Sequence, residues 1–106
     1  MVDHNPGRAA VTLGRRGISQ QMRADLSEAE TTQTRALTIF EAAYGPNHPQ
    51  VAITLTSLGN IQQQHRRIGE AIESTKRALA IFTAAYGPNH HHSQQAQRNL
   101  DKFRSP

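Results

Sequence analysis

The sequence contains no cysteine and no tryptophan, and its only aromatic residues are two tyrosines and three phenylalanines. The absence of cysteine excludes disulfides and thiolate chemistry. No run approaches the ~20 apolar residues that a membrane span requires. The first residues also lack the basic start and apolar stretch of an export signal. We therefore expect a cytoplasmic protein with no membrane partner.

Length and composition set narrow limits on the fold. The chain has 106 residues, of which 36% are hydrophobic. A chain of this size forms one small domain with a modest core, so we expect a single domain over 1–106 with marginal stability. Because aromatic residues are scarce, leucine, isoleucine and alanine must fill that core.

The net charge of +4 raises the question of an acidic partner such as nucleic acid. Arg8, Arg15 and Arg23 recur at spacings of seven and eight residues, so on a helix they share one face, with Arg16 at its margin. No aromatic residues that could stack on bases interleave with them. A solvated helix face is the preferred interpretation, and nucleic acid ranks last among the candidate partners.

One segment of the chain occurs twice. Residues 35–48, RALTIFEAAYGPNH, return at residues 77–90 as RALAIFTAAYGPNH, with 12 of 14 positions identical at an offset of 42 residues. A fixed period in the range of about 20–50 residues is typical of solenoid proteins, in which one supersecondary unit is repeated. The repeat therefore predicts the fold.

The segments between the repeat ends have a helical period. Apolar and small residues recur at spacings of three and four, and nothing resembles a strand. Gly45-Pro46 and Gly87-Pro88 mark helix ends, and Pro49 suits a first helical position. The last helix lacks this proline, so Ser93 or Asn89 is expected to cap it. Helices are predicted at 7–24, 27–44, 49–65, 69–86 and 91–104.

The repeat resembles the tetratricopeptide repeat, in particular the 42-residue kind found in kinesin light chains. The motif ALxIFxAAYGPNHP, complete at residues 36–49, carries the resemblance to that kind. The small residues of the family pattern are matched by Gly17, Ala29 and Ala36 in the first copy and by Gly59, Ala71 and Ala78 in the second. The resemblance implies an all-α, right-handed superhelix of antiparallel hairpins with about five helices. Repeat 1 would span about 7–48, repeat 2 about 49–90, and the polar segment 91–104 would be a capping helix.

The resemblance also implies a function, which is to bind a peptide or partner helix in a concave groove lined by the first helix of each repeat. Mapped by repeat position, the groove residues are Ile18, Gln21, Ile53, Thr56, Asn60, Gln63, Gln64, Arg98 and Lys102. Asn60 is the first candidate for a contact with peptide backbone, because an amide both donates and accepts hydrogen bonds. Arg98 and Lys102 could receive an acidic group. The ordinary alternative is that these residues are polar surface positions.

Some tetratricopeptide domains hold a C-terminal carboxylate with lysines and asparagines at set groove positions. The corresponding positions here are Gly14, Ile18, Ser57, Gln95 and Asn99, and none is a lysine or arginine. This argues against that subclass. A self-associating repeat module, hence a homo-oligomer, remains the main alternative to a protein-binding scaffold.

No enzymatic site is indicated, and no cofactor or metal is expected. The run 90–92 of three histidines lacks the i, i+4 spacing of metal ligands, and neighbours on a helix point in different directions. His65 and Ser74 have no acid placed to orient the histidine. Glu70 and Glu73 have no apolar surroundings that would raise a pKa.

Overall fold

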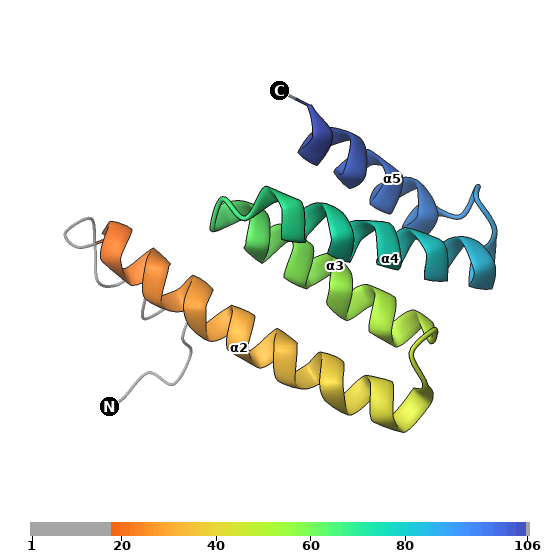
Figure 1. The fold of residues 1–106 in the computed structure, drawn as a ribbon, viewed down its shortest axis with the longest axis horizontal. Helices are drawn as coiled ribbons and strands as arrows, with labels where there is room; N and C mark the ends of the chain where they lie inside the picture. Colours follow the sequence, from red (N-terminus) through yellow and green to blue (C-terminus); the bar gives the residue numbers. More distant parts are fainter. Residues whose placement is uncertain (1–17, 106) are drawn as a thin grey trace, which may run out of the picture.

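The computed structural model describes the backbone of residues 18–105 and the side chains of residues 25–105. This part consists of four α-helices, α2 (Ile18–Tyr44), α3 (Pro49–Gln64), α4 (Ile68–Tyr86) and α5 (His91–Arg104). Residues 18–105 contain no strand. Successive helices run antiparallel and lie side by side in chain order (Figure 1). The prediction of an all-helical repeat fold is confirmed.

The first predicted helix boundary is wrong. Helices were expected at 7–24 and 27–44, but α2 continues without a break through Asp25 and Leu26. The sequence of α2 contains no glycine or proline, so no residue in it favours a helix end or a turn. The remainder of the predicted helix 7–24, before Ile18, lies outside the described residues.

The other helices end and begin at the residues that the repeat marks. Gly45 and Gly87, after α2 and α4, have φ angles of 91° and 89°, which residues with a Cβ rarely adopt. His48 caps α3, where its Nδ1 accepts a hydrogen bond from the Gln50 N–H at 3.0 Å. His90 caps α5 in the same way, so the expected cap at Ser93 or Asn89 is wrong.

The core lies where α3, α4 and α5 meet. Its buried members are Val51, Ala52, Leu55, Ala78, Ile81, Phe82 and Ala96. All of them are aliphatic or small residues except Phe82, which agrees with the scarcity of aromatic residues in the sequence. The close approach of α3 to α4 depends on Gly59, which is buried against the α4 backbone and Thr75.

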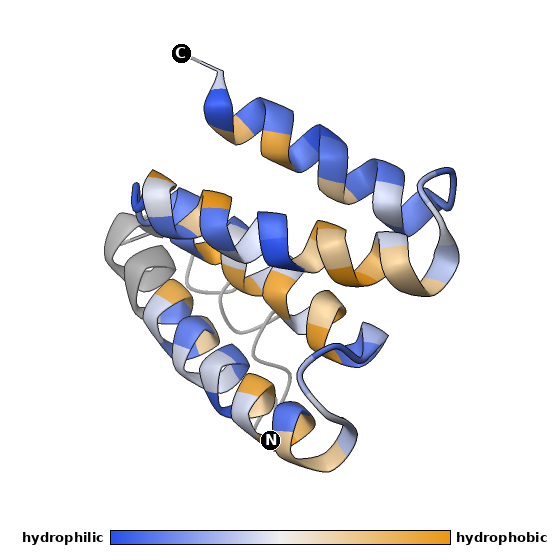
Figure 2. Ribbon diagram, turned by 45° about the vertical axis from the view of Figure 1, so that its right-hand side comes forward, coloured by the Kyte–Doolittle hydropathy of each residue, from blue (hydrophilic) through white to orange (hydrophobic). Residues whose placement is uncertain are grey.

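The two sides of α5 differ in polarity. The buried side chains of α5 are Ser93, Ala96, Leu100 and Phe103. Where α3 has Ala52, Leu55 and Gly59, α5 has exposed polar residues 42 positions later, namely Gln94, Gln97 and Asp101. Most of α5 is correspondingly hydrophilic (Figure 2). This polarity suits a helix whose outer face meets water, but the capping role itself stays a prediction.

Helix α2 is the least buried of the four. None of its described side chains is fully buried. Ile39 is 62% exposed, whereas Ile81, the same repeat position in α4, is 4% exposed. Besides its packing on α3, α2 forms ion pairs with residues of α4 and of the turn between α3 and α4. Its Glu41 Oε2 accepts a hydrogen bond from Arg77 Nη2 of α4 at 2.6 Å.

A second ion pair lies at the turn between α3 and α4. Glu30 of α2 accepts a hydrogen bond from Arg67, which directly precedes α4, and its carboxylate lies 3.2 Å from His65 Nδ1. The hydrogen bond from Arg67 lowers the pKa of Glu30, more than burial of that carboxyl raises it. The middle of α4 and the turn before α4 are thus both tied to α2 by charge.

Candidate functional site

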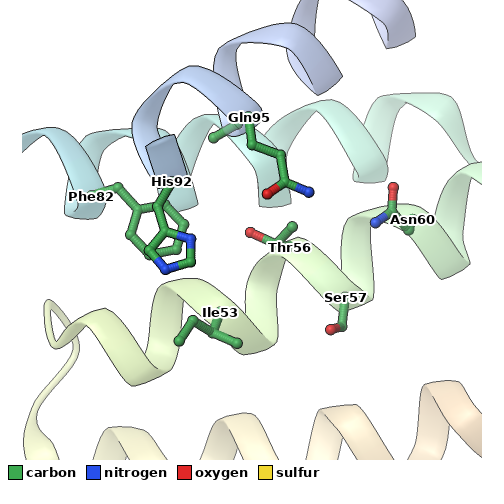
Figure 3. Close-up of a pocket in the computed structure, with 8 residues that line it drawn as sticks. Ile53, Thr56, Ser57, Asn60, Phe82, His92 and Gln95 are labelled. Carbon is green, nitrogen blue, oxygen red and sulfur yellow. The ribbon is translucent and has the colours of Figure 1, made fainter. Parts of the chain in front are cut away.

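A hollow with a volume of about 270 Å³ lies between α3 and α5. Its lining residues are Ile53, Thr56, Ser57, Asn60, Phe82, His92, Gln95 and Ala96. Figure 3 shows the side chains of Thr56 and Gln95 pointing toward each other across the hollow.

Helical spacing explains which side chains meet there. On α3, positions 53, 56, 57 and 60 lie three and four residues apart and share one face. On α5, positions 92, 95 and 96 do the same. Between these two faces Phe82 of α4 forms the floor, and it is 2% exposed. Three helices thus build the site from positions fixed by the repeat.

One end of the hollow is polar and carries unused hydrogen-bonding groups. The amides of Asn60 and Gln95 are exposed, and neither forms a hydrogen bond with any other described residue. Thr56 Oγ1 donates to the Ala52 carbonyl at 2.9 Å, which leaves its oxygen lone pairs available. A primary amide supplies two N–H donors and a carbonyl acceptor. The two amides can therefore pair with both kinds of backbone group on an extended chain.

The other end of the hollow is apolar and aromatic. Ile53 is 41% exposed and lines this end. The ring of His92 stacks on Phe82, with ring centroids 4.9 Å apart and an interplanar angle of 15°. Burial lowers the pKa of His92, and positive charge on His91 and His90 lowers it further. At neutral pH His92 is therefore an uncharged wall of the hollow.

Phe82 and His92 line the hollow but are not among the groove residues expected from the sequence. Phe82 lies on the second helix of its repeat, so a rule that assigns the groove to first helices omits it. His92 was considered only as one of three consecutive histidines that do not have the spacing of metal ligands. Its spacing of three and four residues from Gln95 and Ala96 is the signal that places it on the groove face.

The structure brings together only some of the predicted site residues. Ile53, Thr56 and Asn60 line the hollow. Gln63 and Gln64, at the end of α3, lie outside its lining, and so does Lys102, which is exposed on α5.

Arg98 lines a different hollow, between α4 and α5, together with Leu79, Thr83 and Gln97. It therefore belongs to another surface than Asn60. Ile18 and Gln21 fall in the first turns of α2, and their side chains lie outside the described part. The side chains of the arginine stripe, Arg8, Arg15, Arg16 and Arg23, lie outside it too.

The rings of the three consecutive histidines were expected to point in different directions, but they lie together. Because His90 precedes the helix in an extended conformation, the three rings lie with centroids 4.2 to 5.2 Å apart. Even so, within the described residues no group of three or more histidine, aspartate or glutamate side chains is arranged to hold a metal ion. The rings form an aromatic stack that continues to Tyr86, whose ring lies 4.4 Å from that of His90.

No helix of the described part has the length and hydropathy to cross a membrane. A comparison with curated proteins found no match. The model of the tetratricopeptide repeat, however, matches residues 8–84, which is more than half of the chain. Repeats of this kind are generally protein-interaction modules that act as non-enzymatic scaffolds. With four antiparallel helices in residues 18–105 and a 42-residue period, the chain belongs to the tetratricopeptide repeat family.

Proposed function

We propose that this protein is an interaction scaffold that binds a peptide segment or helix of a partner protein in the hollow between α3 and α5. The observation that carries the proposal is the pair of exposed amides, Asn60 and Gln95, which make no hydrogen bond to other described residues and flank an apolar floor. An extended peptide presents unpaired N–H and C=O groups, which these amides can satisfy. Partner recognition of this kind needs no catalytic group, so we propose no enzymatic activity.

The size of the hollow supports a protein partner. Its volume of about 270 Å³ lies just below the range of about 300–1,000 Å³ typical of small-molecule sites. The space suits one side chain of a partner with backbone lying along the helices. Affinity would then come from several shallow contacts along the groove.

The proposal extends to the finer features that the sequence predicts. We propose that residues 1–106 form one right-handed solenoid of about five helices, with α5 as its cap. We also propose that it is of the kinesin-light-chain-like kind and resides in the cytoplasm. The motif ALxIFxAAYGPNHP at 36–49 supports the subtype. The exposed polar residues on the outer face of α5 support the cap.

Asn60→Ala tests the groove directly. Random twelve-residue peptides displayed on phage would be selected against the full chain, and the best synthetic peptide titrated by isothermal calorimetry. Loss of one or two hydrogen bonds should weaken binding about three- to tenfold. Gln64→Ala is the matched control, because Gln64 is also an exposed amide on α3 but lies outside the hollow. Equal losses in both variants, or no selectable peptide, would contradict the proposal.

Self-association is a second candidate, and the exposure of α2 favours it. Ile39 is largely exposed where its repeat equivalent Ile81 is buried. Covering this surface with a second copy would remove apolar area from water. Sedimentation velocity between about 10 and 200 μM tests this candidate. Ile39→Ser should abolish any concentration dependence, and the exposed Ala42→Ser on the same helix should not.

A further inference from the structure

We infer that the groove selects an uncharged stretch of its partner, seats one apolar side chain of that stretch between Ile53 and His92, and releases it when His92 is protonated. This inference rests on the proposed function and specifies the chemistry and regulation of the same site. Three observations carry it, namely the charge of the groove, the position of Ile53, and the surroundings of His92.

The groove carries no formal charge at neutral pH. Helix α3, PQVAITLTSLGNIQQQ, has no acidic or basic residue in 16 positions. None of the residues that line the hollow is Asp, Glu, Lys or Arg. A charged partner group would lose hydration on entry and find no counter-charge, which is costly. An uncharged segment meets no such penalty.

The charges of α5 lie away from the hollow. Arg98 lines the separate hollow between α4 and α5, and Asp101 accepts a hydrogen bond from Gln97 Nε2 at 3.0 Å. Lys102 is exposed and does not line the hollow. The neutrality of the groove therefore comes from the sides of α3 and α5 that face it, although the whole chain carries a net charge of +4.

Ile53 marks the place of the apolar anchor. It is the exposed large hydrophobic residue of α3, and it stands beside the ring pair of Phe82 and His92. Ala96 forms the rest of the apolar wall, and its small side chain leaves room for the apolar side chain of the partner. Burying one leucine-sized side chain contributes about 1.5–3 kcal/mol. One such side chain is therefore sufficient to anchor a weak peptide.

His92 is the one group in this wall that can change its charge near neutral pH. The titratable groups near it are His91 beside it on α5, His90 before α5 and Tyr86 of α4. No carboxylate is among them, and α3 contributes no titratable side chain. Its position in the first turn of α5 adds the positive end of the helix dipole. A protonated His92 would therefore stand in the wall without a counter-charge.

The pKa of His92 agrees with this geometry. Burial, then the charges of His91 and His90, favour the neutral ring and lower its pKa. A bound apolar side chain would shield the ring from water further and favour the neutral form again. By linkage, proton uptake by His92 must weaken binding of that side chain.

The test uses the full chain and two steps. Random twelve-residue peptides on phage are selected at pH 7.5, and the enriched peptides should share an aliphatic or aromatic residue flanked by residues without charge. One synthetic peptide is then titrated by calorimetry at pH 7.5 and 5.5. Affinity should fall about fivefold in acid, while circular dichroism shows that the helix content is retained.

Two histidine variants assign the effect. In His92→Gln the affinity should be the same at both pH values. In His91→Gln, whose side chain is exposed and does not line the hollow, the fall in acid should remain. Enrichment of acidic or basic peptides would overturn the inference but leave the proposed function standing. An affinity that does not depend on pH would also overturn the inference alone. So would an affinity that changes with pH as much in His92→Gln as in the unaltered chain. If no peptide binds, the proposed function fails and the inference with it.

Discussion

Gly59 of α3 lies so close to Thr75 of α4 that a Cβ atom on Gly59 would stand 2.9 Å from Thr75 Oγ1. Thr75 is 2% exposed, and its hydroxyl donates to the Ala71 carbonyl at 2.7 Å, so it cannot turn away without losing that bond. We expect Gly59→Ala to lower the free energy of unfolding by about 1–2 kcal/mol, because overpacking outweighs the gain in helix propensity. Urea denaturation followed by circular dichroism measures the change.

Gly69 provides the matched control for this substitution. It lies in the first turn of α4, it is exposed, and a Cβ on it would meet no atom within 4 Å. Gly69→Ala should therefore stabilise the fold by up to about 0.5–1 kcal/mol. Similar destabilisation by both substitutions would show that the contact with Thr75 is not what matters.

Arg77 connects α4 to α2 through two acceptors. Its Nη2 donates to Glu41 Oε2 at 2.6 Å and to the Pro46 carbonyl at 3.0 Å. We expect Arg77→Ala to destabilise by about 1–2 kcal/mol, because both acceptors lose a charged donor. Glu41→Gln should cost less, about 0.2–1 kcal/mol, as expected for a partly exposed ion pair. Urea unfolding of the two variants and the double variant gives the coupling.

The more exposed pair of Lys76 and Glu73 serves as the reference for this prediction. Its charged atoms lie 3.7 Å apart within one helix. Lys76→Ala should change stability by less than about 0.5 kcal/mol. If Arg77→Ala changed it no more than this, the link between α4 and α2 would not contribute to stability.

The histidine that ends each copy of the repeated segment caps the helix that follows it. Nδ1 of His48 accepts the hydrogen bond from the Gln50 N–H that caps α3, and His90 does the same for His92. We expect His48→Ala to lower the free energy of unfolding by about 0.5–2 kcal/mol, and His48→Asn, which restores an acceptor, to recover most of it. Thermal unfolding of the two variants measures both changes in stability. An equal loss of stability in both variants would mean that the stacking of His48 on Tyr44, with ring centroids 4.6 Å apart, contributes more than the cap hydrogen bond.

Stability should depend on pH through His92. Because burial and the neighbouring histidines lower its pKa in the folded chain, the unfolded chain takes up this proton at higher pH. The free energy of unfolding should therefore fall as the pH drops through about 6.5, the ordinary value for histidine, and level off below the folded pKa. Urea titrations at pH 7.5 and 5.5 measure this, and His92→Gln should reduce the difference. An unchanged difference would assign the effect to other groups.

The repeat made most of the fold predictable. Glycine and proline marked the ends of α2 and α4 and the start of α3, and these boundaries agree with the structure within one residue. The start of α2 was not predictable in the same way. Ala24, Asp25 and Leu26 carry no signal that ends a helix, so the local sequence gives no support for the predicted break between residues 24 and 27.

The candidate site was less predictable than the fold. Ile53, Thr56 and Asn60, which were chosen by repeat position, line one hollow. Repeat position did not separate Arg98 from these three residues. One side of α5 faces α3 and another side faces away from it, and which residues lie on each side depends on the rotation of α5 about its axis. Phe82 was not among the expected groove residues, because they were taken from the first helix of each repeat, although a core ring can also line a groove. Whether any of these residues binds a partner stays a prediction.

The outward side of α5 shows how few residues distinguish a helix that meets water from one that receives a neighbour. Gln94, Gln97 and Asp101 stand where α3 presents Ala52, Leu55 and Gly59 to α4. Replacing these three by alanine, leucine and glycine would copy the receiving surface of α3. A synthetic hairpin built on the sequence of residues 68–104 could then be grafted behind α5, which would make this small protein a starting unit for designed arrays of chosen length.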